Sequence, residues 1–290
     1  MKSMKLPKTF TEQIDILRAR NLEFGSEIFA TDFLRRVNYY RFSGYLLAFK
    51  QEDGTYKPGT FFEDAVSLYN FDHELRSLMM KAFGIIETEI KTMIAYQHAH
   101  KYGPLGYEDS SNFNTKHNRA QFEKRFEDVK SQRKKSLFVS HHLKSYSGKL
   151  PIWVAVEIFN LGMLSYFYAD LRTEDKKLVA SEFGTSYDYF ETWLHSLTVL
   201  RNTCAHHDRL YNIKFDIAPK LPKEFAKYAN PNDRYLFRYL YMLKLLFYNN
   251  KDKWNNSILA DLVALVQQYS PVLTLESMGL PVLWNFILKW

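Results

Sequence analysis

The sequence predicts an all-α protein, a helical bundle with an N-terminal helical lobe and extra C-terminal helices. Apolar residues recur at steps of three and four along most of the 290-residue chain, which is the spacing of one helix face. An apolar fraction of 46%, with only 11 glycines and 9 prolines, indicates a compact folded chain rather than a disordered one. A chain of this length can bury a large core as one domain or two.

The first 59 residues are predicted to form the lobe. One helix is expected over residues 11–19, with Thr11 as its N-cap. A second helical region covers residues 31–49 and is interrupted near Ser43 and Gly44. The stretch QEDGTYKPG at 51–59 then predicts a turn or short hairpin. The expected division is 1–59 for the lobe and 60–290 for a helical core, with one continuous domain as the alternative.

The longest predicted helix covers residues 62–100, which contain no proline and a single glycine, Gly84. Its apolar stripe consists of Phe71, Leu75, Leu78, Met79, Ala82, Ile86, Ile90 and Ile94. The stretch GPLG at 103–106 is expected to end it. A basic helix over 116–135 is predicted next.

The remaining helices follow from the same spacing. The stretch PIW at 151–153 begins an apolar helix that is expected to end near residue 171, and a shorter helix follows Thr173. The next helix is predicted over 187–209. Two more are expected at 233–249 and 255–269.

The net charge of +7 is concentrated in one segment, residues 116–149, which holds ten Lys and Arg against three acids. The rest of the chain is therefore neutral. A solvated helix face explains such a segment, and so does a binding surface for a polyanion such as RNA. On the second interpretation the RNA-binding residues are Lys124, Arg125, Lys130, Arg133, Lys134 and Lys135.

Other features bound the class of protein. The single cysteine, Cys204, excludes an intrachain disulfide and fits a reducing compartment. No apolar run is long enough to span a bilayer, and the basic stretch at residues 1–8 lacks the apolar core of a signal peptide, so a soluble cytoplasmic protein is expected. The aromatic content of 17% indicates either core packing or base stacking. The histidines show no metal-ligand spacing.

The most informative stretch is LRNTCAHHDRLYN at 200–212, near the end of the predicted helix over 187–209. On that helix one face is apolar: Trp193, Leu194, Leu197, Leu200, Cys204 and Ala205. Asn202, His206 and Arg209 fall in a neighbouring polar sector, whereas His207 falls on the other flank. Cys204 is expected to pack as a small apolar residue.

Arg201 is the anomaly, because it falls at the centre of the apolar face. A buried guanidinium is costly unless it is paired, so an ion pair with Glu87 or Glu89 is one explanation. Another is that the side chain extends outward to water. The third is that Arg201 binds a phosphate in a cleft. His206 could then exchange a proton near neutral pH, and Asn202 could orient a group beside it.

These residues resemble the signature of Abi-like abortive-infection proteins of the AbiD/AbiF type, within the HEPN superfamily. Residues 37–45, VNYYRFSGY, resemble the N-terminal block of that family, and residues 150–165 resemble its middle block. The resemblance runs from about residue 10 to 215 and implies a HEPN-like helical bundle. The last 75 residues match nothing beyond helices.

The resemblance implies a metal-independent endoribonuclease without a cofactor, acting in phage defence or as the toxin of a toxin–antitoxin pair. The ribose 2′-hydroxyl attacks the adjacent phosphate and leaves a 2′,3′-cyclic phosphate. Arg201, Asn202 and His206 match the catalytic motif, with His206 as acid or base and Arg201 stabilising charge on the phosphate. Arg209 either binds RNA backbone or caps its helix. One motif per chain implies a homodimer with a shared site.

The alternative is a non-catalytic HEPN-type module that holds a structured small RNA or a protein partner. Arg201 would then form a structural ion pair. The basic segment would hold the RNA, which could also be an inhibitor of a nuclease.

Overall fold

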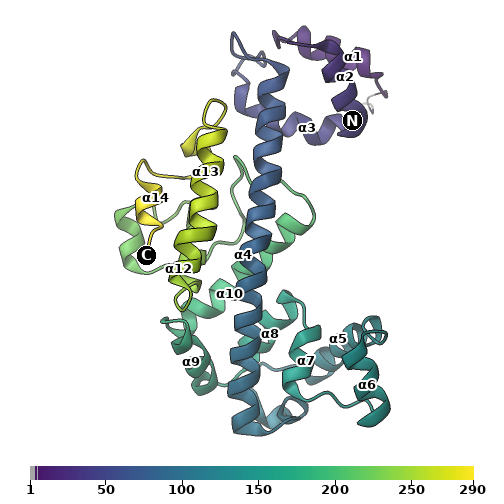
Figure 1. Ribbon diagram of the computed structural model, residues 1–290, viewed down its shortest axis with the longest axis vertical. Coiled ribbons are helices and arrows are strands. Elements are labelled where there is room, and N and C mark those ends of the chain that lie inside the picture. The colour runs from purple at the N-terminus through teal and green to yellow at the C-terminus, as the bar shows by residue number, and fades with distance from the viewer. Residues whose placement is uncertain (1–3, 5) are drawn as a thin grey trace.

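The computed structural model describes Met4 and residues 6–290, and the long helix α4 (Phe62–Tyr102) is its central element (Figure 1). This helix has 41 residues and is therefore about 60 Å long. The all-α prediction is confirmed, because the described residues contain isolated β-bridges but no strand. The helices that precede α4 in the chain lie at its N-terminal end, and those that directly follow it lie toward its C-terminal end.

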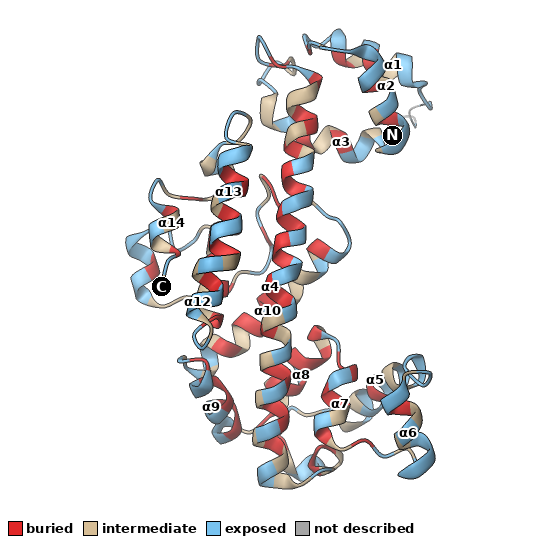
Figure 2. Ribbon diagram, viewed as in Figure 1, coloured by how far each residue is buried: buried red, intermediate tan, exposed pale blue. Residues whose placement is uncertain are grey.

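The prediction of α4 is also confirmed. All eight residues of the predicted stripe are buried, and buried positions recur along the whole helix (Figure 2). The helix ends at Gly103, whose φ of 76° is accessible to glycine at little cost, and whose N–H donates to the Ala99 carbonyl at 2.8 Å.

Three helices precede α4: α1 (Phe10–Arg18), α2 (Glu27–Arg36) and α3 (Tyr39–Leu46). The predicted N-cap of α1, Thr11, is wrong. Thr9 caps the helix instead, because its hydroxyl accepts the Glu12 N–H and the Glu12 carboxylate accepts the Thr9 N–H in return.

The interruption predicted near Ser43 and Gly44 is also wrong, since both residues lie within α3. The chain breaks earlier, at Val37 and Asn38. Val37 is extended, and the Asn38 side chain accepts the Tyr40 N–H at 2.8 Å, which starts a new helix.

These three helices and the first turns of α4 enclose an apolar cluster of their own. Phe33, Phe42 and Phe62 meet at its centre, with ring centroids 4.8–5.8 Å apart. Phe62 belongs to α4, so the cluster extends beyond residue 59. The predicted turn over 51–59 is present, and Lys50 and Tyr56 form an antiparallel bridge across it.

Five helices lie toward the C-terminal end of α4 (Figure 1): α5 (Arg119–Gln132), α6 (Leu137–Ser145), α7 (Ile152–Ile158), α8 (Leu161–Asp170) and α9 (Thr173–Glu182). The single helix predicted from 152 to about 171 is divided into α7 and α8, because the Asn160 side chain accepts the Met163 N–H at 2.8 Å and caps α8. Helix α6 was not predicted from the sequence.

The rest of the chain comprises α10 (Tyr187–Ala205), α11 (Leu236–Leu246), α12 (Lys251–Lys253), a π-helical turn (Trp254–Leu259), α13 (Ala260–Gln268) and α14 (Trp284–Ile287). Helix α13 lies beside α4, where Lys81 pairs with Asp261 at 2.7 Å and Tyr269 donates to Glu74 at 2.6 Å. Single 3-10 turns occur at Leu47–Phe49, Gly106–Glu108, Ser110–Asn112, Lys223–Lys227 and Leu275–Met278.

The described helices include none with the length and apolar character needed to cross a membrane. The prediction about a signal peptide concerns residues 1–8, of which 1–3 and 5 lie outside the described residues.

His98 is buried in the C-terminal half of α4 among the rings of Tyr102, Phe113 and Phe167, with centroids 5.0–5.6 Å away. Burial lowers the pKa of His98 to about 4. Asp175 opposes this shift, and Lys101 adds to it. The imidazole is therefore neutral inside the fold at pH values where an unfolded histidine is protonated.

We expect this histidine to destabilise the protein in acid. Between pH 6.5 and about 4 the unfolded chain binds a proton at His98 that the folded chain does not, so stability falls as pH falls. From pH 8 to pH 5 the contribution is about 2 kcal/mol. Urea unfolding of wild type and His98→Phe at both pH values should show the variant losing less stability by about that amount. Equal losses would contradict the assignment.

Candidate active site

Helix α10 carries the stretch 200–212 to the middle of the molecule, where it packs between α4 and α8. Its predicted apolar face is buried, with the exception of Ala205, which is exposed. Burial raises the pKa of the Cys204 thiol to about 12, so this cysteine stays protonated and packs as a small apolar side chain.

The predicted end of this helix at residue 209 is wrong, because α10 ends at Ala205. His206 is the C-cap, and His207 takes the left-handed conformation with a φ of 58°. The His207 N–H donates to the Cys204 carbonyl at 3.1 Å, and the Asp208 N–H donates to the Thr203 carbonyl at 2.9 Å. These two bonds form a Schellman motif, which reverses the chain without the usual glycine.

Arg201, Asn202 and His206 lie together at this helix end. The Arg201 guanidinium is half-buried and donates to the Asn202 side-chain oxygen at 3.3 Å. The Asn202 carbonyl accepts the His206 N–H at 2.9 Å. Asn202 therefore contacts both of the other candidates, Arg201 through its side chain and His206 through its backbone.

The structural ion pair considered for Arg201 is absent among the described residues. Glu87 pairs with Lys91 at 2.9 Å, and Glu89 accepts a hydrogen bond from Asn250. The guanidinium of Arg201 keeps donors free for an anion. The His206 side chain is exposed, and no described residue hydrogen-bonds its imidazole.

Two arginines bind backbone carbonyls of the turn that follows α10. Arg41, from α3, donates to the His207 carbonyl, and Arg76, from α4, donates to the Asp208 carbonyl at 3.3 Å. Arg209 extends in the opposite direction and donates to the Gly44 carbonyl in α3. A Cβ at position 44 would lie 3.1 Å from the Arg209 guanidinium, so a glycine allows this approach.

The placement of Arg209 excludes one of its two predicted roles, since it contacts α3 rather than capping its own helix. The contact with Gly44 was not predicted from the sequence, although Gly44 belongs to the block VNYYRFSGY at 37–45. For Arg41, in the same block, the sequence left two alternatives, an approach to the site or a packed aromatic cluster, and its bond to the His207 carbonyl favours the first.

The carboxylate of Asp72 holds the turn after α10 in place through hydrogen bonds. It is fully buried in α4 and accepts the Tyr45 hydroxyl at 2.7 Å and the Leu210 and Tyr211 N–H groups at 3.1 and 2.8 Å. It also forms an ion pair with Arg76. Burial raises the pKa of Asp72, whereas Arg76 and the three hydrogen bonds oppose the shift by favouring the charged carboxylate.

The basic segment lies elsewhere, on α5 and α6, whose surfaces are mostly exposed (Figure 2). Of the predicted RNA-binding residues, Arg125 stacks over the Tyr166 ring at 4.6 Å, and Lys130 pairs with Glu127 at 2.6 Å. The others are exposed and form no ion pair with a described residue: Lys124, Arg133, Lys134 and Lys135.

The structure does not join this segment to the motif by any contact between described residues. The motif is tied to α4 at Asp72 and Arg76, whereas Arg119 of α5 donates to Tyr107, just beyond the other end of α4. The two attachment points are about 40 Å apart along the helix.

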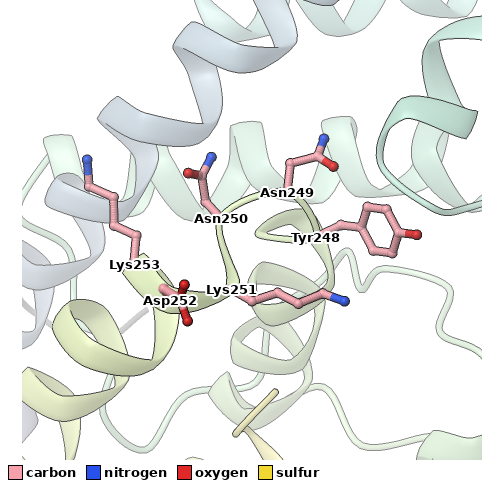
Figure 3. Close-up of a pocket in the computed structure, with 6 residues that line it drawn as sticks. All are labelled: Tyr248, Asn249, Asn250, Lys251, Asp252 and Lys253. Atoms are coloured by element: carbon pink, nitrogen blue, oxygen red, sulfur yellow. The ribbon is translucent and has the colours of Figure 1, made fainter.

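The described residues contain no group of three His, Cys, Asp or Glu side chains arranged to hold a metal. A shallow polar pocket lies at the turn between α11 and α12 (Figure 3). Its amides hold neighbouring segments, since Asn249 donates to the Glu182 carbonyl at 2.7 Å and Asn250 donates to Glu89. These side chains therefore serve packing.

Comparison with known proteins gives one match. A family model described as Abi-like protein matches residues 32–212, which is more than half of the chain. The matched region begins in α2, includes α3 with its contacts to the motif, and ends at Asn212. No curated protein and no solved structure matches the chain.

The Schellman motif predicts a stabilising substitution. His207→Gly should increase the free energy of unfolding by about 1 kcal/mol, because glycine adopts a positive φ without the Cβ penalty. Ala205→Gly, two residues earlier and inside the helix, should decrease it by about the same amount. Urea unfolding of both variants checks the assignment, and a destabilised His207→Gly protein would contradict it.

The buried carboxylate predicts a large loss. Asp72→Asn should destabilise the protein by about 3–5 kcal/mol, because it leaves the Arg76 guanidinium buried without its counter-ion. Tyr45→Phe removes one hydrogen bond to the same carboxylate and should cost about 1 kcal/mol. If chemical denaturation shows equal losses for the two variants, the ion pair does not have this role.

Proposed function

The chain belongs to the Abi-like protein family, and on that basis we propose that it is a metal-independent endoribonuclease of the HEPN type. Its biological role in this proposal is phage defence by abortive infection, or the toxin activity of a toxin–antitoxin pair. The site is the end of α10, with Arg201, Asn202 and His206 as the catalytic residues.

The observation that carries the proposal is the series Arg201, Asn202 and His206 at the end of α10, in which the Arg201 and Asn202 side chains are hydrogen-bonded and His206 is joined to Asn202 through backbone atoms. It offers a guanidinium without an acidic partner among the described residues, an amide beside it, and an exposed imidazole. A helix C-terminus disfavours anions, so phosphate binding here depends on cationic side chains such as Arg201. The bonds from Arg41 and Arg76 to the next two carbonyls reduce the negative potential of the same turn.

The proposed reaction is transesterification within RNA. The ribose 2′-hydroxyl attacks the adjacent phosphorus, the bond to the 5′-oxygen of the next nucleotide breaks, and the products are a 2′,3′-cyclic phosphate and a 5′-hydroxyl. The imidazole of His206 transfers a proton to or from these oxygens. Arg201 stabilises the added negative charge on the phosphate, and Asn202 orients the guanidinium.

The proposal includes a homodimer, because one chain supplies one motif and two histidines facing one phosphate would provide both an acid and a base. The exposed position of His206 at the C-cap is compatible with a second copy approaching it.

A second candidate function is supported by the separation of the basic segment from the motif. In it the protein holds a structured small RNA or a protein partner and does not cut. The RNA would then be bound by the four basic side chains that form no ion pair with a described residue: Lys124, Arg133, Lys134 and Lys135. RNA that copurifies with the protein and stays intact would favour this candidate.

The nuclease proposal predicts cleavage in the presence of EDTA. Purified protein should cut RNA to fragments with 2′,3′-cyclic phosphate ends, and Arg201→Ala and His206→Ala should each reduce the rate by about 100-fold or more. His195→Ala is the matched control, because His195 is also exposed on α10 but lies outside the series, and it should cut normally. The fragment ends are identified with a phosphatase, which removes a terminal phosphate monoester but leaves a 2′,3′-cyclic phosphate intact until the ring is hydrolysed. Equal cutting by wild type and His206→Ala would refute the proposal.

A further inference from the structure

A groove lined by exposed rings lies between α6, α7 and the end of α4, away from the motif. One cavity of about 440 Å³ is bordered by His142, Tyr146, Lys149 and Trp153, with Pro104 and Leu105 as its far wall. Tyr146 and Trp153 are exposed to 56% and 52%, and Trp153 differs in this from the other four tryptophans, which are buried or half-buried.

The groove continues on the other side of Trp153. A second cavity of about 300 Å³ is lined by Trp153, Tyr96 and His100, and the last two rings are 4.0 Å apart. Tyr96 is exposed as well. On the first side the rings of His142 and Tyr146 stack at 5.0 Å. Trp153 thus stands between two pairs of rings, and we call the whole surface the Trp153 groove.

Positive charge predominates around this groove, although Glu157 lines its second cavity. Residues 129–156, which include α6, the following loop and Trp153, contain six Lys and Arg and neither Asp nor Glu. Lys144 is exposed and free of ion pairs with described residues. Lys149 borders the groove and pairs with Glu108 at 3.0 Å on the surface, where a phosphate can compete for it. At the opposite end of α6, about 14 Å away, are the exposed Lys134 and Lys135.

We propose that the Trp153 groove binds single-stranded RNA. Bases stack on Trp153 and Tyr146, and phosphates contact Lys149, Lys144 and the turn that contains Lys134 and Lys135. Rings combined with positive charge are what a single strand requires, because every base has a π-face and every linkage has a negative charge. Stacking needs unpaired bases, so this site discriminates against a duplex, which the charge of α5 and α6 alone does not.

The inference rests on the proposed function in one respect, that RNA is the ligand. It does not require cleavage. A protein partner fits less well, because the buried centre of a protein–protein interface is normally depleted of charged residues, whereas this groove has lysines beside its rings.

The test uses the full chain and a fluorescein-labelled oligo(U) 12-mer with 2′-O-methyl groups, which lacks the attacking hydroxyl and is not cut. Fluorescence anisotropy should show that Trp153→Ala and Tyr146→Ala each weaken binding about 5- to 100-fold. Trp153→Phe, which keeps a ring, should recover most of the affinity. Tyr40→Ala is the matched control, because Tyr40 is an exposed ring (88%) on α3, and its binding should equal that of wild type.

A second readout does not depend on the alanine variants folding. Trp153 is the one exposed tryptophan of the five in the chain, all of which lie among the described residues. Oligo(U) should therefore quench tryptophan fluorescence in wild type, and the quenching should disappear in Trp153→Phe.

Three results would overturn the inference: wild-type affinity in Trp153→Ala, equal competition by duplex RNA of the same length, or a change of sedimentation in Trp153→Ala without RNA, which would make the groove a contact between two copies. His206→Ala separates the two proposals. If it binds oligo(U) normally but wild type cuts no RNA, the nuclease proposal fails and the groove stands. If wild type cuts RNA and Trp153→Ala binds normally, the groove fails and the nuclease stands.

Discussion

One buried carboxylate determines how the candidate site is held. Asp72 accepts hydrogen bonds from α3, from α4 and from the turn after α10, so three segments that are far apart in the sequence meet at its two oxygens. A charge with no access to water has to be fully paired, and few alternative arrangements of the three segments would pair it. The orientation of the turn is therefore coupled to the packing of the N-terminal helices, although none of these helices contributes a catalytic candidate.

This coupling gives the extent of the family match a physical meaning. The matched region, residues 32–212, begins in α2 and ends one residue after Tyr211, whose N–H is the last group bound by Asp72. Within it, Arg41 and Arg209 form reciprocal contacts between α3 and the turn, each bound to a carbonyl of the other segment. The C-terminal helices α11 and α13 lie outside the match. Together with the π-helical turn between α12 and α13 they add core, including the buried Trp254 and Leu262.

Periodicity predicted the long helices well, because the buried stripe of α4 and the apolar face of α10 are properties of local sequence. The breaks between helices were predicted poorly. At Asn38 and Asn160 a side-chain amide caps a new helix, and at His207 a non-glycine residue takes a left-handed conformation, all of which depend on interactions that outweigh helix propensity. Asp72 was missed because an acid in a long helix looks like a solvent-facing residue until its partners are known. The motif residues Arg201, Asn202 and His206 were chosen from the sequence, but their mutual contacts came only from the place where α10 ends.

Helix α4 has a further consequence, because it is straight and continuous between the two places where RNA is proposed to act. Arg76, which contacts the turn of the motif, and Tyr96, which lines the Trp153 groove, are 20 residues apart on it, or about 30 Å. A strand that keeps the stacked rise of roughly 3.4 Å per nucleotide covers this axial distance with about nine nucleotides. The length of α4 thus sets the axial spacing of the two places, even though the RNA need not touch the helix itself.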